Sequence, residues 1–246
     1  MIKKEFPIIR YDHGRAESRM DPVICESWLS VYLNDQLLTE IPVTNRDLPD
    51  LVTGILYTEG YLRPSEIPVI KLDGSLCRVT LDRSIQIRTL RDQVDCASSR
   101  IELDETIIPL QPGPLRTPDD ILSLTAAFQK LPSVYHETGG VHMAAYGEDQ
   151  IEFWADDISR RNAVDKVIGK GFLGGVDLSR GLIITSGRIS SDLVLRMVKV
   201  GIPLIVSLSA PTDTALELAS SYGVTVCGFA RGLRINVYTQ GDRLGL

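Results

Sequence analysis

Leu182-Ile183-Ile184-Thr185-Ser186-Gly187-Arg188-Ile189-Ser190 is the stretch of sequence that decides the fold. A short apolar run ends in a polar loop that contains glycine, and a helical pattern follows over residues 190–200. The same order recurs one unit later, where Leu204-Ile205-Val206 precedes a polar loop and a helix predicted at 212–222. Strands that alternate with helices in this way pair largely in parallel and are covered by helices. The pattern therefore predicts an α/β fold.

Apolar periodicity predicts the other elements on both sides of this stretch. In the C-terminal part these are a helix at 159–172 and strands at 139–146, 150–155, 181–186, 203–208, 223–228 and 234–239. In the N-terminal part they are a strand at 23–33 with a hairpin partner at 36–43, a helix at 47–62, and strands at 66–72, 76–81 and 84–90. A further helix should run from Thr117 to about Lys130, because a threonine N-cap, a proline and two acidic residues suit a helix start. We expect two parts, a strand-rich one over 1–115 and an α/β one over 116–246.

The composition is that of an ordinary globular protein, with 246 residues of which 43% are hydrophobic and 24% charged. No apolar stretch is long enough to span a bilayer, and residues 1–7 lack the apolar core of a signal peptide. Four cysteines spread over the chain are typical of reduced thiols and not of a disulfide framework. We therefore expect a cytoplasmic protein with no membrane partner.

The net charge of −6 is unevenly distributed along the chain. Residues 1–157 carry 15 basic and 26 acidic side chains, whereas residues 158–246 carry 11 basic and 6 acidic ones. Opposite signs in two segments indicate that the C-terminal part binds an anionic partner. Two parts that simply compensate each other are the alternative.

Cys96 is the one cysteine placed for chemistry, because it lies in a polar stretch over residues 91–100. Cys25, Cys77 and Cys227 alternate with or end apolar runs, which is typical of buried thiols. A thiol in an exposed loop among arginines is more reactive than a buried one. A surface cysteine without a role is the alternative. Residues 91–114 are predicted to be a mobile segment, since three prolines and a glycine lie at their far end.

Three polar clusters are predicted to bind an anionic ligand. The loops over 185–191 and 207–212 each join a strand end to a helix start, where hydroxyls, amides and the helix dipole can hold phosphate. Ordinary N-capping by Ser190 and Thr212 is the alternative. In the third cluster, Phe229 can stack on a planar ring, and Arg231 and Arg234 can bind phosphates or a guanine edge. A turn with solvated arginines is the alternative there.

Two arginines at a helix start and one histidine at a strand start are further candidate site residues. Arg160 and Arg161 lie at a helix start and oppose its dipole, so an anionic group should compensate them, with Asp156 and Asp157 as candidates. His142 follows two glycines as a strand entry, and its use as a catalytic base is a weaker hypothesis. The histidines have no metal-ligand spacing, and neither a Walker loop nor a dinucleotide glycine motif is present. No structural metal is expected.

Several long motifs, in this order, resemble the FdhD family of formate dehydrogenase accessory sulfurtransferases. They are Glu59-Gly60, Thr138-Gly139-Gly140-Val141-His142-Met143-Ala144-Ala145, the run from Asp157 to Gly169, Ser186-Gly187-Arg188-Ile189-Ser190, Ser209-Ala210-Pro211-Thr212 and Gly228-Phe229-Ala230-Arg231 through Thr239. The resemblance covers nearly the whole chain. It implies a mixed sheet with flanking helices like that of cytidine deaminase, without its zinc, beside a smaller strand-rich part.

The resemblance also implies an activity and its partners. Sulfur would pass as a cysteine persulfide from a cysteine desulfurase to the molybdenum cofactor, in its bis-guanine-dinucleotide form, before insertion into formate dehydrogenase. Cys96 matches the first cysteine of the family's Cys-x-x-Cys loop. The segment that matches cofactor binding comprises Phe229, Ala230, Arg231, Gly232, Leu233 and Arg234, to which the strand-end loop adds Ser186, Gly187, Arg188 and Ser190. We expect a homodimer and no nucleic acid.

The chain departs from the family pattern at two positions. Ser99 replaces the second loop cysteine, so a resolving disulfide with Cys96 cannot form, although one thiol suffices to carry a persulfide. Arg161 stands where the family has histidine, which removes a proton-transfer group and adds a positive charge. A non-catalytic chaperone that binds the cofactor or the dehydrogenase, with Cys96 incidental, is the alternative function.

Overall fold

The computed structural model describes residues 1–87, 109–110 and 116–246. Its largest sheet has six strands in the order β12-β11-β10-β9-β7-β8. The strands are β7 (His142–Gly147), β8 (Ile151–Asp157), β9 (Leu182–Thr185), β10 (Leu204–Ser207), β11 (Thr225–Arg231) and β12 (Arg234–Val237). Within this sheet, β9, β10 and β11 pair in parallel, whereas β7 and β12 join them antiparallel. The α/β class and the mixed sheet are confirmed, and the expectation of a largely parallel sheet is wrong, because both ends of the sheet are closed by hairpins.

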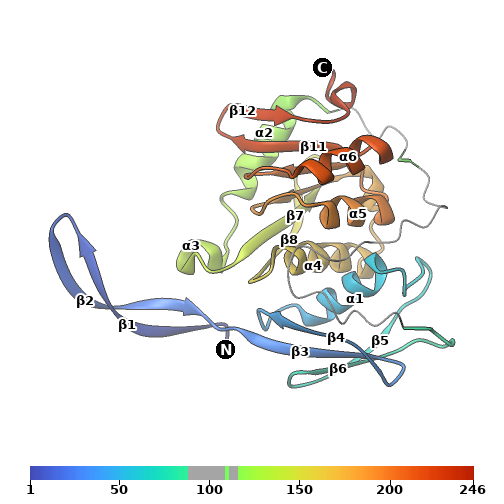
Figure 1. The fold of residues 1–246 in the computed structure, drawn as a ribbon, viewed down its shortest axis with the longest axis horizontal. Helices are drawn as coiled ribbons and strands as arrows, with labels where there is room; N and C mark the ends of the chain where they lie inside the picture. The colour runs from blue at the N-terminus through green and yellow to red at the C-terminus, as the bar shows by residue number, and fades with distance from the viewer. Residues whose placement is uncertain (88–108, 111–115) are drawn as a thin grey trace.

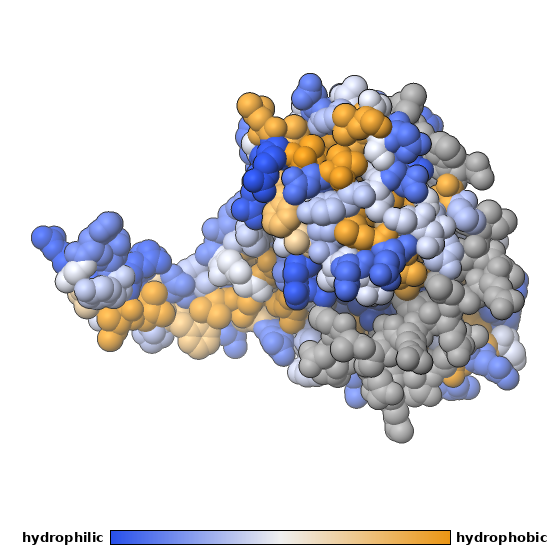
Figure 2. Space-filling model, turned by 45° about the horizontal axis from the view of Figure 1, so that its top comes forward, coloured by the Kyte–Doolittle hydropathy of each residue, from blue (hydrophilic) through white to orange (hydrophobic). Residues whose placement is uncertain are grey.

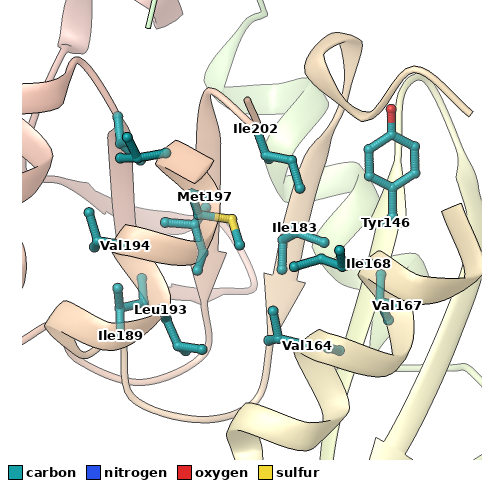
Figure 3. Close-up of a cluster of buried hydrophobic side chains, with 14 of the residues drawn as sticks. Tyr146, Val164, Val167, Ile168, Ile183, Ile189, Leu193, Val194, Met197 and Ile202 are labelled. Atoms are coloured by element: carbon teal, nitrogen blue, oxygen red, sulfur yellow. The ribbon is translucent and has the colours of Figure 1, made fainter. Parts of the chain in front are cut away.

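Helices cover both faces of this sheet (Figure 1). They are α2 (Pro118–Phe128), α4 (Arg160–Leu173), α5 (Ser191–Val200) and α6 (Asp213–Tyr222), with short α3 (Val134–Thr138) and the 3₁₀ turns η1 (Leu178–Arg180) and η2 (Gly241–Leu244). Ile183 points into the cluster made with α4, α5 and α6, whereas its neighbour Ile184 points into the cluster made with α2. Figure 3 shows Ile183 facing Ile168 of α4, with Met197 of α5 close by. Successive strand residues face opposite sides, so these short apolar strands are buried on both.

The helix predicted to begin at Thr117 is confirmed together with its cap. The Thr117 hydroxyl accepts a hydrogen bond from the Asp120 amide at 3.2 Å, and the Asp120 carboxylate accepts one from the Thr117 amide at 2.8 Å. This reciprocal arrangement satisfies two amides that the helix itself leaves without partners. The short helix α3, in contrast, was not predicted.

A second, four-stranded sheet lies in the N-terminal half. It has the order β4-β3-β6-β5 and comprises β3 (Ser27–Leu33), β4 (Gln36–Val43), β5 (Val69–Asp73) and β6 (Leu76–Thr80), with α1 (Leu48–Thr58) packed on its inner face. The predicted hairpin of β3 and β4 is confirmed. The strand predicted at 84–90 is wrong over 84–87, and the remainder lies outside the described residues. The Asn34 side chain binds this segment instead, donating to the carbonyls of Leu81 and Arg83 at 3.2 and 2.8 Å.

A two-stranded arm precedes this sheet and projects from the rest of the molecule (Figure 1). It consists of β1 (Lys3–Asp12) and β2 (Arg15–Ile24), which pair antiparallel. The single strand expected over 23–33 is therefore wrong at its beginning, since the chain leaves one sheet after Ile24 and enters the next at Ser27. Cys25 lies at this junction and is half-buried, not part of the core as expected. Its amide donates to the carbonyl of Ile2 at 2.7 Å, at the root of the arm.

Helices α1 and α4 join the two larger sheets by direct backbone contact. A Cβ atom added at Gly54 would lie 1.8 Å from the Asp165 carbonyl oxygen, and one at Gly169 would lie 1.8 Å from that of Asp50. Only glycine permits so close an approach. The division of the chain at residues 115 and 116 stays a prediction, because residues 111–115 lie outside the described part.

Gly169→Ala should lower the free energy of unfolding by about 1–3 kcal/mol or more, because the added methyl group collides with backbone that cannot rotate away. Alanine is otherwise a better helix former than glycine, so helix propensity alone predicts that the free energy of unfolding rises by about 1 kcal/mol. Urea unfolding followed by circular dichroism measures the difference. Leu173→Ala, at the exposed end of the same helix, is the control and should change little. A stabilised Gly169→Ala variant would contradict this account of the helix contact.

Candidate functional site

Two loops at the carboxyl ends of β9 and β10 form one continuous surface. Ile189 and Pro211 form a parallel bridge, and the Thr212 amide donates to the Ile189 carbonyl at 2.9 Å. Below this surface, the buried Ser207 hydroxyl donates a hydrogen bond to the Gly187 carbonyl at 2.6 Å. The structure thus brings together the two loops in which the sequence predicted ligand-binding groups, as expected where parallel strands end at the same edge.

The capping explanation for these loops does not hold. Ser190 and Thr212 occupy the N-cap positions of α5 and α6, yet neither side chain makes a capping hydrogen bond. Arg188, in the loop before α5, is exposed. Hydroxyl groups, a guanidinium and the positive ends of two helix dipoles therefore face the same edge, which favours a negatively charged ligand.

The turn between β11 and β12 is fastened to the second of these loops. The Phe229 amide donates to the Ser209 carbonyl at 3.0 Å, and Arg231 donates Nε and Nη2 to the Leu208 carbonyl at 3.2 and 2.9 Å. A Cβ atom at Gly228 would meet the Ser209 carbonyl oxygen at 3.1 Å, so glycine permits this approach. The Phe229, Arg231 cluster therefore lies beside the strand-end loops, and all the predicted binding residues share one edge of the sheet.

Side chains of this turn differ in what they can offer a ligand. Phe229 adopts a left-handed backbone with φ of 52°, a conformation that is rare and costly for a bulky residue. The Arg234 guanidinium carbon lies 5.7 Å from the centre of the Phe229 ring, so an arginine already stacks on the ring that was expected to receive a ligand. Leu233 is 99% exposed, whereas Ala230 is buried and can contribute only its backbone.

A hollow of about 270 Å³ lies at the other end of this edge, where β7 begins beside the end of β9. It is lined by Tyr135, Gly139, Gly140, Val141, His142, Ile158 and Ser186. The Ser186 hydroxyl accepts from the Met143 amide at 2.9 Å, which fixes this serine between the hollow and the loop that follows β9. The sequence had singled out His142 only weakly and had not placed it beside Ser186.

The missed helix α3 supplies Tyr135 to the wall of this hollow. Its signals were Ser133, whose hydroxyl accepts from the Tyr135 amide at 3.0 Å, and Gly139, which ends the helix with φ of 64°. Such an N-cap and C-cap pair marks a helix of only five residues, too short for a hydrophobic period to show.

Burial lowers the pKa of His142, and the nearby positive charge of Arg160 lowers it further, while Asp157 acts in the opposite direction. The imidazole is therefore neutral at neutral pH and can both donate and accept a hydrogen bond. Gly187 makes room for both neighbours, because a Cβ atom there would lie 2.9 Å from the Arg160 Cβ and 3.3 Å from Nδ1 of His142.

Arg161 faces away from the hollow, toward α1. Its Nη2 lies 2.6 Å from the Glu59 carboxylate, and its Nε lies 3.7 Å from that of Asp165. The expectation that Asp156 or Asp157 compensates the arginines of this helix start is thus wrong for Arg161, because Asp157 is engaged by Lys166 at 2.8 Å. The positive charge that replaces the family histidine is neutralised inside the protein.

Comparison with known proteins decides the relationship. The model of the FdhD/NarQ family matches residues 24–245. The chain belongs to this family. Proteins named sulfur carrier protein FdhD from Bacillus licheniformis and Listeria monocytogenes serotype 4b are both 33% identical to it, over 96% of this chain and 95% and 97% of their own. The protein of that name from Bacillus subtilis is 32% identical over 96% of this chain and 95% of its own.

The FdhD/NarQ fold is confirmed by a solved structure. A protein from Desulfotalea psychrophila, described as a formate dehydrogenase accessory protein, superposes with a TM-score of 0.82 over 99% of this chain and 100% of its own. The two sequences are 24% identical, so this likeness speaks for the fold alone. The likeness to cytidine deaminase stays a prediction.

The cysteine thiols in the described part of this FdhD/NarQ member differ in burial. Cys77 and Cys227 are fully buried, which raises the pKa of their thiols to about 11 and about 12 and keeps them protonated. Cys96 and nearly all of the segment predicted to be mobile lie outside the described residues. Within the described part, no three histidine, cysteine or carboxylate side chains are grouped to hold a metal ion, and no helix is long and apolar enough to cross a membrane.

The His142 imidazole should titrate below the ordinary histidine pKa of about 6.5. Replacing Arg160 with glutamine removes one of the two causes and should raise that pKa. Because the folded-state pKa lies below the unfolded one, the histidine's contribution to stability is present above about pH 6.5 and is lost as the pH falls through the folded value. Two-dimensional NMR of the imidazole protons, assigned with His142→Gln, measures both effects. A pKa at or above 6.5 in the wild type would contradict the burial of this ring.

Proposed function

We propose that this chain is a sulfur carrier that takes sulfur from a cysteine desulfurase on Cys96 and passes it to the molybdenum cofactor of a formate dehydrogenase. The cofactor is the substrate, in its bis-guanine-dinucleotide form. The observation that carries this proposal is the single edge that gathers the Ser186 to Ser190 loop, the 207–212 loop and the Phe229 to Arg234 turn. The names of the relatives, sulfur carrier protein FdhD, support the same reading.

The loading step needs one thiolate. The Cys96 thiolate attacks the outer sulfur of the desulfurase persulfide, a new S–S bond forms, and the desulfurase thiolate leaves as its own S–S bond breaks. Since the thiols of Cys77 and Cys227 are buried and protonated, they cannot compete for this sulfur. Ser99 cannot form a disulfide with Cys96, so the persulfide persists until it is delivered. In this sense the protein acts as a sulfurtransferase.

The binding edge suits a guanine dinucleotide. Its phosphates are negatively charged, and the residues of the C-terminal part from 158 onward carry 11 basic against 6 acidic side chains. Phe229 and Arg234 offer stacking surfaces to a base, and two of the five N–H groups of Arg231 are engaged by Leu208, which leaves the others to phosphate. The backbone at Gly232 permits a close approach, because no other atom would lie within 4 Å of a Cβ there. We place this activity in the cytoplasm, where thiols stay reduced.

Cys96→Ser should abolish sulfur loading. Incubation with a desulfurase and cysteine should add one sulfur atom to the wild-type protein, and peptide mapping by mass spectrometry should place it on the peptide that contains Cys96. Cys25→Ser is the matched control, because Cys25 is the one thiol in the described part of the chain that is not fully buried, and this variant should load normally. Equal loading of Cys96→Ser and the wild type would place the sulfur on another residue.

The same variant separates the carrier from the non-catalytic chaperone. In a strain without its own accessory protein, Cys96→Ser should leave formate dehydrogenase inactive. The variant should still keep the fold, since the polar sequence around Cys96 predicts a thiol outside the core, where a substitution changes stability little. The chaperone predicts full activation without the thiol. Wild-type dehydrogenase activity in that strain would therefore refute the sulfur-carrier proposal and leave the chaperone.

GDP should bind at the sheet edge that contains Phe229. Arg231→Ala should weaken the free energy of GDP binding by roughly 1.5–3 kcal/mol, the usual loss for a charged hydrogen bond. Phe229→Ala should weaken it as well, through the lost stacking. Titration calorimetry measures both. Arg180→Ala removes an equal charge from a surface pair with Glu148 and should bind GDP as the wild type does. Unchanged affinity in both edge variants would place the nucleotide elsewhere.

A further inference from the structure

A negatively charged side chain follows directly after a loop of the proposed nucleotide site. The loop from Ser186 to Ser190 leads into α5, and Asp192 lies in the first turn of that helix. A carboxylate at this place suits the helix dipole, but it repels the phosphate groups of a nucleotide bound at the loop. A site for an anion at this edge therefore requires that the charge of Asp192 be balanced from inside the protein.

Two arginines balance the charge of Asp192. Arg196, one turn further along α5, donates from Nη1 to the Asp192 carboxylate and, at 3.4 Å, to the Asp192 carbonyl. Arg161, in the first turn of α4, has its Nε 4.0 Å from the same carboxylate. Burial acts to raise the pKa of Asp192, yet the positive charges of Arg196 and Arg161 hold it below its ordinary value, so the group is ionised at neutral pH.

These arginines belong to a group of ion pairs that joins α1, α4 and α5. Its members are the carboxylates of Glu59, Asp165 and Asp192 and the guanidinium groups of Arg161 and Arg196. The Asp192 side chain is 25% exposed, which makes it the most exposed carboxylate of the group. Lys199 of α5 adds a positive charge from farther away. Without Arg161, three carboxylates would face one guanidinium, and the excess negative charge would be sensed first at Asp192.

The start of α4 lies directly against the Ser186 to Ser190 loop. A Cβ atom at Gly187 would lie 2.9 Å from the Arg160 Cβ, so the residue before Arg161 contacts the loop. Figure 1 shows the starts of α5 and α6 on the side of the molecule from which the arm projects. Figure 2 shows strongly hydrophilic residues at several places along that side. The Arg161 guanidinium itself points inward, with Nη2 2.6 Å from the Glu59 carboxylate.

We propose that Arg161 is a positioning residue of the nucleotide site, which favours phosphate at the Ser186 to Ser190 loop by neutralising Asp192. The inference rests on the proposed binding of a nucleotide at this edge. When Arg161 is removed, no contact between protein and ligand is lost, but the unbalanced carboxylate repels phosphate. Arg196 acts on Asp192 as well, yet it is buried, and its removal would also disturb the packing of α5. Arg161 is therefore the residue at which the effect of charge can be measured by itself.

Titration calorimetry with GDP tests this role. Arg161→Gln should raise the dissociation constant of GDP roughly 3- to 10-fold, as expected for one unbalanced charge that acts from beyond contact distance near a protein surface. Asp192→Asn should bind GDP at least as tightly as the wild type. The double variant Arg161→Gln with Asp192→Asn restores the balance of charge and should bind within about 2-fold of the wild type.

A control and a salt series separate the effect of charge from damage to the fold. Lys170→Gln removes a positive charge from the same helix, where Lys170 lies 2.9 Å from the Asp47 carboxylate, and it should bind GDP as the wild type does. The ratio of the dissociation constants of Arg161→Gln and the wild type should fall toward unity as NaCl is raised to about 0.5 M, because ions screen the repulsion. A displaced loop would leave that ratio unchanged. Circular dichroism checks that each variant is folded.

The outcomes distinguish this inference from the proposed function. Equal binding of GDP by Arg161→Gln and the wild type would refute the role of Arg161 and leave nucleotide binding in place. A double variant as weak as Arg161→Gln would refute it too, because Arg161 would then act by contact with the ligand or through the fold. A wild type that binds no GDP would overturn both the inference and the nucleotide site of the proposed function.

Discussion

The buried carboxylate of Asp157 is the interaction on which the arrangement of the two larger sheets depends. It lies 2.8 Å from Nζ of Lys166 and accepts hydrogen bonds from the amides of Thr44 and Ser159 at 3.1 and 3.0 Å, and from the Asn162 side chain at 3.0 Å. These partners come from the end of β4, the start of α4 and α4 itself, while Asp157 ends β8. Leaving either buried charge of the pair unpartnered costs about 3–5 kcal/mol, so the joint tolerates little rearrangement.

The position of α4 that results also shapes the candidate site. The first residue of this helix, Arg160, lies beside His142 and Gly187, and the next, Arg161, reaches back to Glu59 on α1. Arg196 of α5 joins the same group at 3.1 Å from Glu59 and 2.8 Å from Asp165. The start of α4 thus supplies one positive charge beside His142 and a second one to the carboxylates of Glu59 and Asp165. The hollow and the loop that follows β9 meet at Ser186.

Sequence patterns predicted the parts of the fold that face a core. The alternation in β3, the cap at Thr117 and the short apolar strands each report burial or a helix end, which are local properties. The two-stranded arm was not predicted from the sequence, because neither of its faces packs on a core within the chain. The one local signal was the turn at His13-Gly14, where both residues have positive φ, as tight hairpin turns require. In the site, neighbouring parallel strands made the proximity of the Ser186 loop and the Phe229 turn predictable. The place of His142 depends on β7 inserting antiparallel beside β9, which only the tertiary fold determines.

The left-handed backbone of Phe229 has a consequence for how the stability of this protein can be raised. Substitutions chosen for stability would favour glycine at such a position, because glycine adopts this conformation without strain of about 1–3 kcal/mol. The chain keeps a large aromatic ring there instead, with the guanidinium of Arg234 beside it. Under the proposed function, a glycine at this position would stabilise the fold and weaken nucleotide binding, so thermal tolerance should be sought in the sheet cores and the ring left in place.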